Sequence, residues 1–164
     1  MSTSPGRSRD LIASLGLIAH PEGGYYREVY RSPASVKPSD RREPRSALTT
    51  IFFLLTHGQF SRWHRVQSDE VWHFYEGATL DLWITSPEIS RVEHHRLGSA
   101  DAVQRPVLVV PAGWWQAARS SGAYTLTGCT VGPGFDFEDF ALDVDDPASA
   151  ETFRQLGGPI AALL

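Results

Sequence analysis

The stretch Gly58-Gln-Phe-Ser-Arg-Trp-His-Arg-Val-Gln-Ser-Asp-Glu-Val-Trp-His-Phe-Tyr-Glu-Gly77 predicts two β-strands joined by a tight turn. Two runs rich in aromatic and β-branched residues flank a short polar turn at residues 67–69. Side chains alternate between the two faces of a strand, and we expect Glu70 to open the second strand on the face that carries His64 in the first. The stretch therefore predicts a hairpin that brings an imidazole and a carboxyl group together.

The His64–Glu70 pair suits two kinds of chemistry, and the hairpin alone does not choose between them. An imidazole and a carboxylate can bind a divalent metal ion. They can equally form a proton-transfer pair in which the carboxylate orients the imidazole. Trp72 and Phe74 follow Glu70 on the same strand face, so we expect them to point inward with it and count both as candidate substrate-binding residues.

A second segment, residues 111–120, follows the apolar run 107–110 and is typical of a turn that leads into another strand. The side chain of Gln116 in this segment is a candidate for binding a substrate carbonyl or hydroxyl group. We expect most aromatic side chains to fill the core. Trp72 or Trp114 is expected to form a wall of the pocket, where an indole can stack on a planar ligand or a sugar.

The rest of the chain predicts an all-β fold, because short strands follow one another between breaks that contain glycine and proline. We interpret residues 32–46 as a surface loop whose basic residues, Arg41, Arg42 and Arg45, are solvated. The expected strands are 25–30, 47–56, 61–66, 70–76, 79–85, 91–97, 106–110, 114–119 and 123–131.

The two ends of the chain differ from the middle. Residues 1–7 are polar and are expected to be disordered, and residues 8–16 predict a short helix. A second helix is expected over residues 147–156, because Asp146 offers an N-cap and proline follows at the first helical position. The 164 residues show no linker and fit one domain that spans 1–164.

Composition narrows the classes of partner. The formal net charge of −4 argues against nucleic-acid binding, since a phosphate backbone requires a basic surface. The longest strongly apolar run, residues 51–55, is far shorter than the ~20 residues that span a bilayer. The N-terminus lacks the apolar segment of a secretory signal, so we expect a cytoplasmic protein. The one cysteine, Cys129, cannot form an internal disulfide and is expected to be a buried, unreactive thiol.

The opening hairpin resembles the first sequence motif of the cupin superfamily. Gly58, His64, Glu70 and Gly77 stand at the spacings of that motif. Val66 stands where metal-binding cupins carry a second histidine. The departure at this position puts a tightly held metal ion in doubt.

Residues 111–120 resemble the second cupin motif, with Pro111 and Gly113 in place and Gln116 where a third histidine is usual. The chain is similar above all to the Cupin_5 subgroup, long described as a domain of unknown function, over roughly residues 10–142. This resemblance implies a double-stranded β-helix, or jelly-roll, barrel with one pocket, usually in a dimer. It does not imply one reaction, because cupins host many. The strings that carry it are His20-Pro-Glu-Gly-Gly-Tyr-Tyr-Arg-Glu28, Trp63-His-Arg-Val66, Ser68-Asp-Glu-Val-Trp-His-Phe-Tyr75, Val110-Pro-Ala-Gly-Trp-Trp-Gln-Ala-Ala118, Gly128-Cys-Thr-Val131 and Pro133-Gly-Phe-Asp-Phe-Glu-Asp-Phe140.

Three functions follow from the resemblance. The favoured one is isomerase- or epimerase-type proton transfer on a small polar, carbohydrate-like molecule without a cofactor, in which His64 and Glu70 are catalytic and Gln116 positions the substrate. The second is a metal-dependent, oxygenase-like cupin in which His64, Glu70 and Gln116 bind a divalent metal, although a carboxamide oxygen is a poor ligand beside imidazole. The third is a non-catalytic binder of a small molecule.

The string His20-Pro-Glu-Gly-Gly24 and the residues after it have two interpretations. His20, Glu22, Tyr26 and Arg27 would either close the pocket or cross a dimer interface. Arg27 would bind an anionic substrate group or form an intramolecular ion pair. We predict a homodimer, because open barrels commonly protect their strand edges by pairing with a second copy.

Overall fold

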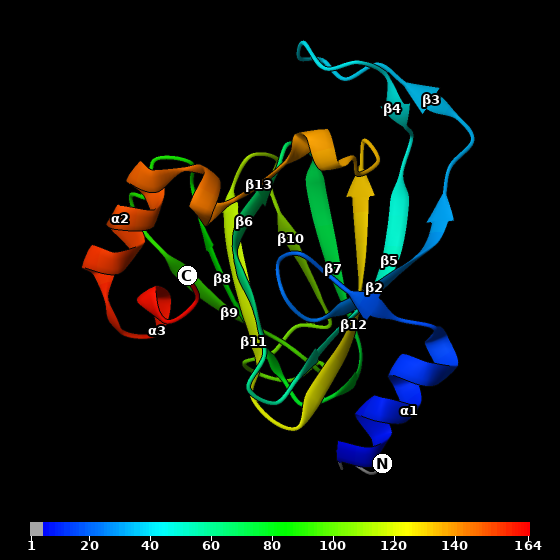
Figure 1. Ribbon diagram of the computed structural model, residues 1–164, viewed down its shortest axis with the longest axis vertical. Helices are drawn as coiled ribbons and strands as arrows, with labels where there is room; N and C mark the ends of the chain where they lie inside the picture. Colours follow the sequence, from blue (N-terminus) through cyan, green and yellow to red (C-terminus); the bar gives the residue numbers. More distant parts are fainter. Residues whose placement is uncertain (1–4) are drawn as a thin grey trace.

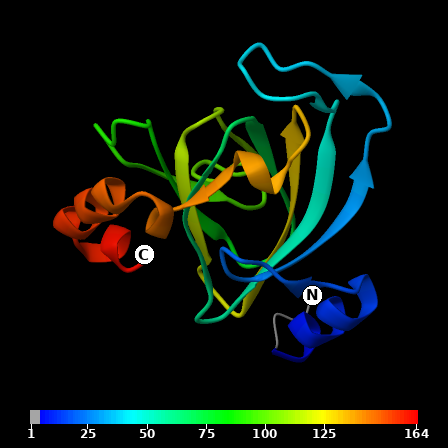
Figure 2. The ribbon, with the colours of Figure 1, turned by 45° about the horizontal axis from the view of Figure 1, so that its top comes forward.

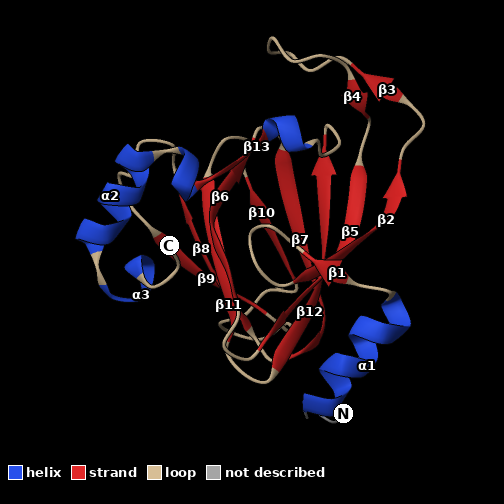
Figure 3. Cartoon of the chain, viewed as in Figure 1, coloured by secondary structure: helices blue, strands red, loops and turns tan. Residues whose placement is uncertain are grey.

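Two antiparallel β-sheets lie face to face and form most of the molecule, as Figure 1 and Figure 3 show. The computed structural model describes residues 5–164. The larger sheet has the order β1 (Ile18–Ala19), β2 (Tyr25–Arg31), β5 (Thr49–Thr56), β12 (Tyr124–Gly132), β7 (Asp69–Gly77) and β10 (Val107–Val110). The smaller sheet has the order β13 (Phe140–Leu142), β6 (Phe60–Val66), β11 (Trp115–Ser120), β8 (Leu80–Thr85) and β9 (Glu93–Leu97). The predicted all-β class is confirmed.

The main core fills the space between the inner faces of the two sheets. Strand β5 shows how the alternation works: Phe53 and Leu55 point inward and are buried, while Leu54 points to the outer face. Trp72 of β7 and Leu82 of β8 meet the inward side chains from the other strands. Each such buried side chain contributes roughly 1.5–3 kcal/mol of hydrophobic stabilisation.

Helices cover the outer faces of both sheets. Helix α1 (Pro5–Leu15) places Leu11 in a cluster with Leu54 and Leu126 on the larger sheet. On the smaller sheet Phe153 stacks on Trp63 with ring centroids 4.2 Å apart. Phe153 belongs to helix α2 (Pro147–Leu156), and the one-turn helix α3 (Gly158–Ala161) follows it. No helix among the described residues is long and apolar enough to cross a bilayer.

The predicted strands are all present, with ends that differ by at most two residues from those expected. Helix α2 has the predicted bounds, and Asp146 caps it by accepting a hydrogen bond from the backbone N–H of Ser149. Helix α1 begins at Pro5 rather than at residue 8, so the prediction of disorder was wrong for residues 5–7, and residues 1–4 lie outside the described part. The sequence did not predict β1, β13, α3 or the 3-10 turns η1 (Phe137–Asp139) and η2 (Asp143–Asp145). It also missed two short strands within residues 32–46, β3 (Ser35–Val36) and β4 (Arg45–Ser46).

Two irregularities in strand pairing shape the inner face. The register between β2 and β5 shifts between Glu28 and Tyr30, and that between β11 and β6 shifts between Gln116 and Ala118. Such bulges insert an extra residue and so change which side chains share a face. Both bulges lie beside the site described below.

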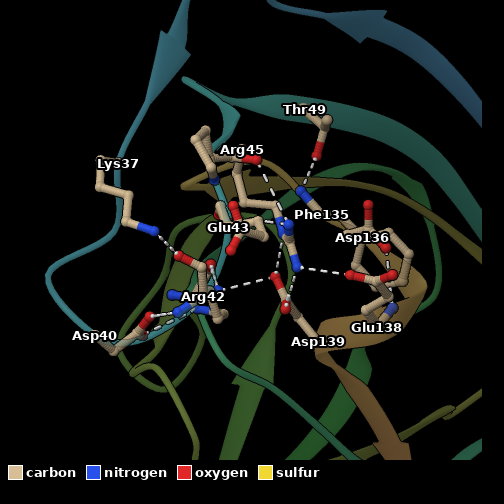
Figure 4. A network of polar contacts seen from close by, with 12 residues as sticks. Lys37, Asp40, Arg42, Glu43, Arg45, Thr49, Phe135, Asp136, Glu138 and Asp139 are labelled. Carbon is tan, nitrogen blue, oxygen red and sulfur yellow. Dashed lines mark hydrogen bonds and ion pairs between the residues drawn. The ribbon is translucent and has the colours of Figure 1, made fainter.

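Residues 32–46 form an arm that projects beyond the barrel in Figure 1 and contains the short strands β3 (Ser35–Val36) and β4 (Arg45–Ser46). The prediction that its arginines are solvated was wrong for Arg45, which is buried. Its guanidinium binds both carboxylate oxygens of Asp139 at 2.9 Å, and Arg42 binds the same carboxylate at 2.9 Å (Figure 4). Bidentate pairing of this kind compensates the cost of burying the charges. The network fastens the arm to η1, next to the cavity.

Candidate functional site

A cavity of about 240 Å³ lies between the two sheets and has two distinct ends. The wall between the ends is mostly apolar. The buried end is lined by Glu22, His64, Glu70 and Cys129, none of which is more than 7% exposed. The mouth is lined by Glu28, Arg31, Asp136 and Phe137. The remaining lining residues are His20, Tyr26, Thr49, Ile51, Phe53, Val66, Val131 and Phe135.

His64 lies on β6 with both ring nitrogens engaged. Its Nδ1 is 2.8 Å from the carbonyl oxygen of Arg62. A carbonyl oxygen can only accept a hydrogen bond, so Nδ1 carries a proton and the neutral ring presents the lone pair of Nε2. Nε2 is 3.2 Å from Oε2 of Glu22. Burial lowers the pKa of His64, and the nearby Glu70 opposes that effect.

Glu22 reaches His64 because a tight turn folds across the barrel. The backbone N–H of Arg62 on β6 donates to the carbonyl oxygen of Glu22 at 2.9 Å, and Figure 2 shows the loop after β1 reaching toward β6. Gly23 has φ of +110°, and a Cβ there would collide with the carbonyl oxygen of Phe60. The turn therefore requires glycine next to Glu22 in order to lie this close to β6.

The carboxyl group of Glu22 is enclosed among neutral groups. The hydroxyl of Ser61 donates to Oε1 at 2.8 Å, which is possible because the bulge in β6 places Ser61 on the face of His64. Burial raises the pKa of Glu22 to about 8, and the hydrogen bond from Ser61 partly opposes this. At neutral pH Glu22 is therefore protonated and donates to the lone pair of His64 Nε2.

His20 completes the polar cluster from the other side of Glu22. The backbone N–H of Glu22 donates to Nδ1 of His20 at 3.2 Å, so that nitrogen is an acceptor and the proton of the neutral ring resides on Nε2. The ring packs edge-on against Tyr26 with centroids 4.5 Å apart. Burial, with repulsion from His64, lowers the pKa of His20 to about 3.

Glu70 is held in the buried end by a chain of hydrogen bonds. The indole Nε1 of Trp72 can only donate, and it lies 2.9 Å from Oε1 of Gln116. This contact fixes the amide, so that Nε2 of Gln116 faces Glu70 and donates to its Oε2 at 2.6 Å. Burial raises the pKa of Glu70, while His64 and the bond from Gln116 partly oppose this.

Cys129 lies beside Glu70 and is not a nucleophile. Its thiol is buried, and burial together with the adjacent carboxyl groups Glu70 and Glu22 raises its pKa well above the usual range. The thiolate is the reactive form of cysteine, so this side chain acts as a weak donor to Glu70. The predicted unreactive thiol agrees with this environment.

The donor set does not fit the metal centre that the cupin resemblance implies. Gln116 turns its amide nitrogen, not its oxygen, toward Glu70, and the oxygen is already used by Trp72. Val66 lines the cavity where a second histidine would ligate. Among residues 5–164 no three His, Cys, Asp or Glu side chains converge in a way that could hold a metal ion. Binding a metal through His64, Glu70 and Gln116 would require the Trp72–Gln116 bond to break.

The structure brings together part of the predicted site. His64 and Glu70 lie in the buried end, and Gln116 lies behind Glu70, outside the lining of the cavity. Trp72 is buried in the main core, and Phe74 packs against that core without lining the cavity. These two aromatic side chains fill the barrel rather than face a ligand.

Trp114 and Arg27 lie away from the cavity. Trp114 lines a separate groove together with Leu108. Arg27 points to the outer face of β2, where it donates to the carbonyl oxygen of Leu15 at 3.1 Å. The arginine that lines the cavity is Arg31. The predicted binding roles of Trp72, Phe74, Trp114 and Arg27 thus have no counterpart in the lining of the cavity.

Glu22 is the site residue that sequence reasoning did not assign. It was expected only to close the pocket or to cross an interface, and Glu70 was expected as the partner of His64. The available signal was the string His20-Pro-Glu-Gly-Gly24, whose paired glycines indicate a tight turn. The sequence does not say against which strand such a turn packs.

Comparison with known proteins places this geometry in a family. A hypothetical protein from Leishmania major is 28% identical, with a TM-score of 0.84 over 95% of this chain and 97% of that chain. A protein from Shewanella oneidensis is 34% identical, with a TM-score of 0.76 over 93% of this chain and 98% of that chain. No protein with a curated description matches the sequence.

More distant structures share the fold alone. Oxalate decarboxylase from Bacillus subtilis is 16% identical, with a TM-score of 0.58, over 84% of this chain and 32% of that chain. The family described as "Cupin superfamily (DUF985)", Cupin_5, matches residues 9–143. Because this match spans most of the chain and the two sheets form the cupin barrel, the chain belongs to the Cupin_5 family of the cupin superfamily.

Proposed function

We propose that the cavity binds a small polar molecule and that His64 transfers a proton to or from it, in an isomerase- or epimerase-type reaction. One observation carries the proposal. His64 presents the lone pair of Nε2 inside the cavity, with Nδ1 fixed by a carbonyl oxygen and a protonated carboxyl group, Glu22, 3.2 Å away. A neutral base beside two carboxyl groups with raised pKa values is an arrangement suited to proton transfer near neutral pH.

The proton transfers balance within the polar cluster. A C–H bond beside a substrate carbonyl breaks, and its proton goes to Nε2 of His64. The electron pair forms a C–C double bond, and the carbonyl oxygen takes a proton from the carboxyl group of Glu70. For an isomer, the imidazolium of His64 gives its proton to the former carbonyl carbon, and the hydroxyl group on the neighbouring carbon gives its proton to the carboxylate of Glu70 as the new carbonyl group forms. For an epimer, the intermediate turns its opposite face to His64, the proton returns to the same carbon, and the enol hydroxyl gives its proton back to Glu70. Glu22 donates to Nε2 of His64 before a ligand binds, so its hydroxyl group must turn away from Nε2 for His64 to accept the substrate proton.

Gln116 acts as a positioning residue in this scheme. Its amide is oriented by Trp72 and holds Oε2 of Glu70. The bond to the carboxylate form limits how far burial raises the pKa of Glu70. Gln116 therefore sets both the orientation and the acidity of Glu70.

The proposal is tested by hydrogen exchange in D2O. Uncharged hydroxy-ketones and aldoses, beginning with dihydroxyacetone and glyceraldehyde, are incubated with the protein, and proton NMR follows loss of the C–H signal beside the carbonyl group. We expect catalysed exchange with at least one compound. Replacement His64→Gln is expected to reduce it about 100- to 10,000-fold, the usual contribution of a general base.

His57→Gln is the matched control, because His57 is exposed and lies outside the lining of the cavity. Equal exchange rates in His64→Gln and the unchanged protein would contradict the role of His64. A compound that binds in the cavity and is recovered without deuterium would assign the site to binding alone. A stoichiometric transition metal in the purified protein, lost in His64→Ala, would favour the metal-dependent alternative.

A further inference from the structure

The mouth of the cavity holds one guanidinium group between carboxyl groups. Among the described residues that line the cavity, Arg31 is the one with a permanent positive charge. Its Nε and Nη2 donate to the two carboxylate oxygens of Glu28 at 2.9 and 2.8 Å. Asp136, across the mouth, also attracts Arg31. The positive charge at the mouth is thus compensated before a ligand arrives.

A bulge in β2 builds this pair. Residues three apart in a regular strand point to opposite faces. The shift between Glu28 and Tyr30 inserts an extra residue, so that Glu28 lies opposite Ile51 and Arg31 lies opposite Thr49. Ile51 and Thr49 both face the cavity, and so do their partners. Because of the bulge, the carboxylate of Glu28 and the guanidinium of Arg31 lie together at the mouth.

The buried end offers no cation to a ligand. The carboxyl groups of Glu22 and Glu70 receive hydrogen bonds from neutral donors, the hydroxyl of Ser61 and the amide of Gln116. A phosphate or carboxylate group at this end would lose its hydration without meeting a positively charged side chain. An uncharged ligand with hydroxyl and carbonyl groups can instead donate to and accept from the same side chains.

We infer that the cavity selects uncharged polar ligands and rejects anionic ones, and that Glu28 sets this selectivity by occupying Arg31. The inference rests on the proposed function, because it names the charge class of the molecule on which His64 acts. Unphosphorylated hydroxy-carbonyl compounds fit this class, and sugar phosphates and nucleotides do not. Arg27, for which binding of an anionic substrate group was one of two interpretations, does not line the cavity.

Anion titrations test the inference without requiring turnover. The side-chain Nε–H NMR signal of Arg31 is followed while inorganic phosphate or dihydroxyacetone phosphate is added, with dihydroxyacetone as the uncharged counterpart. We expect no saturable shift with either anion in the unchanged protein. Glu28→Gln removes the carboxylate from Arg31 but keeps its hydrogen bond to the carbonyl oxygen of Phe135, so we expect a saturable shift and anion binding tighter by at least about tenfold.

Two further variants make the result specific. Glu88→Gln removes the same charge at a fully exposed position outside the cavity lining and is expected to behave like the unchanged protein. Glu28→Gln combined with Arg31→Gln is expected to lose the gained binding. Saturable anion binding at Arg31 in the unchanged protein, or its absence in Glu28→Gln, would overturn the inference. Either result leaves the exchange assay of His64 to be judged separately, so failure of the selectivity and failure of the proton transfer are distinguishable.

Discussion

Glu22 is a carboxyl group that the fold encloses without supplying a cation. The groups that face it are His64, His20, Ser61 and, as a like charge, Glu70. Its pKa is raised from 4.5 to about 8, chiefly by burial. In the folded protein Glu22 thus stays protonated over a range in which the unfolded chain has already lost that proton. The arrangement makes the stability of the fold depend on this ionisation, on which the proposed proton transfer also depends.

Replacement Glu22→Gln is expected to remove a pH dependence of stability. A folded pKa above the unfolded value means that stability from this group is complete below about pH 4.5 and declines as the pH rises through about 8. The carboxamide does not ionise, so the unfolding free energy of the variant relative to the unchanged protein rises across that window. The rise is at most about 1.4 kcal/mol per pH unit.

Thermal unfolding at several pH values between about 4.5 and 8 measures this difference. The lowered pKa of His20 acts in the opposite sense, since its stability contribution is lost as the pH falls from 6.5 toward about 3. His20 is present in both proteins, so its direct contribution largely cancels. A difference in stability that stays constant across the window would show that Glu22 ionises normally in the folded protein.

At the level of elements, periodicity predicted the strands well and the bulges not at all. The alternation that turns His64 and Glu70 toward the barrel interior is a local property of the chain, so the sequence carries it. The predicted hairpin was wrong, because β6 belongs to the smaller sheet and β7 to the larger one, and the two side chains meet across the cavity from facing sheets. A bulge depends on the partner strand, so local alternation does not predict it. The bulge after Glu28 turns Arg31 toward the cavity, whereas the sequence analysis had considered Arg27. The partner of His64 could not be predicted for the same reason, because Glu22 comes from a turn that packs across the barrel.

Replacement Gly23→Ala is expected to displace the turn that carries Glu22. The added Cβ would meet the carbonyl oxygen of Phe60, a backbone atom of β6, at a positive φ that alanine adopts poorly. We expect a loss of about 1–3 kcal/mol in stability, measured by thermal unfolding. The imidazole NMR signals of His64 should change as well, since the Glu22 contact would be lost.

Gly58→Ala separates the collision from the backbone strain. Gly58 also has a positive φ, +78°, but a Cβ there would have no atom within 4 Å. Gly58→Ala should lower the stability by less than Gly23→Ala does, and it should leave the NMR signals of His64 unchanged. Equal shifts of these signals in both variants would contradict the packing role of Gly23.

At the level of the whole molecule, helices cover the outer faces of the two sheets but leave most of the outer edge of β2 without a pairing strand. Strand β2 pairs with the short β1 only at Tyr25 and Tyr26, and among residues 5–164 no strand lies beyond the rest of its outer edge. Val29 and Tyr30 on this strand are 45% and 50% exposed, and Val36 on the adjoining arm is 37% exposed. An open edge with apolar side chains favours association.

We propose that a second copy of the chain covers this edge and that the protein is a homodimer. Two identical edges can pair antiparallel about a two-fold axis, because each then presents the same row of backbone donors and acceptors to the other.

The molar mass of the protein in solution tests the dimer. Light scattering on the protein as it elutes from a size-exclusion column, at micromolar concentration, should give the mass of two chains. Val29→Lys places a charge in the contact and should shift the protein toward one chain. Val144→Lys, a similarly exposed position on η2, should leave the dimer intact. A single-chain mass for the unchanged protein would refute the dimer, and a dimer that withstands Val29→Lys would move the interface to another face of the barrel.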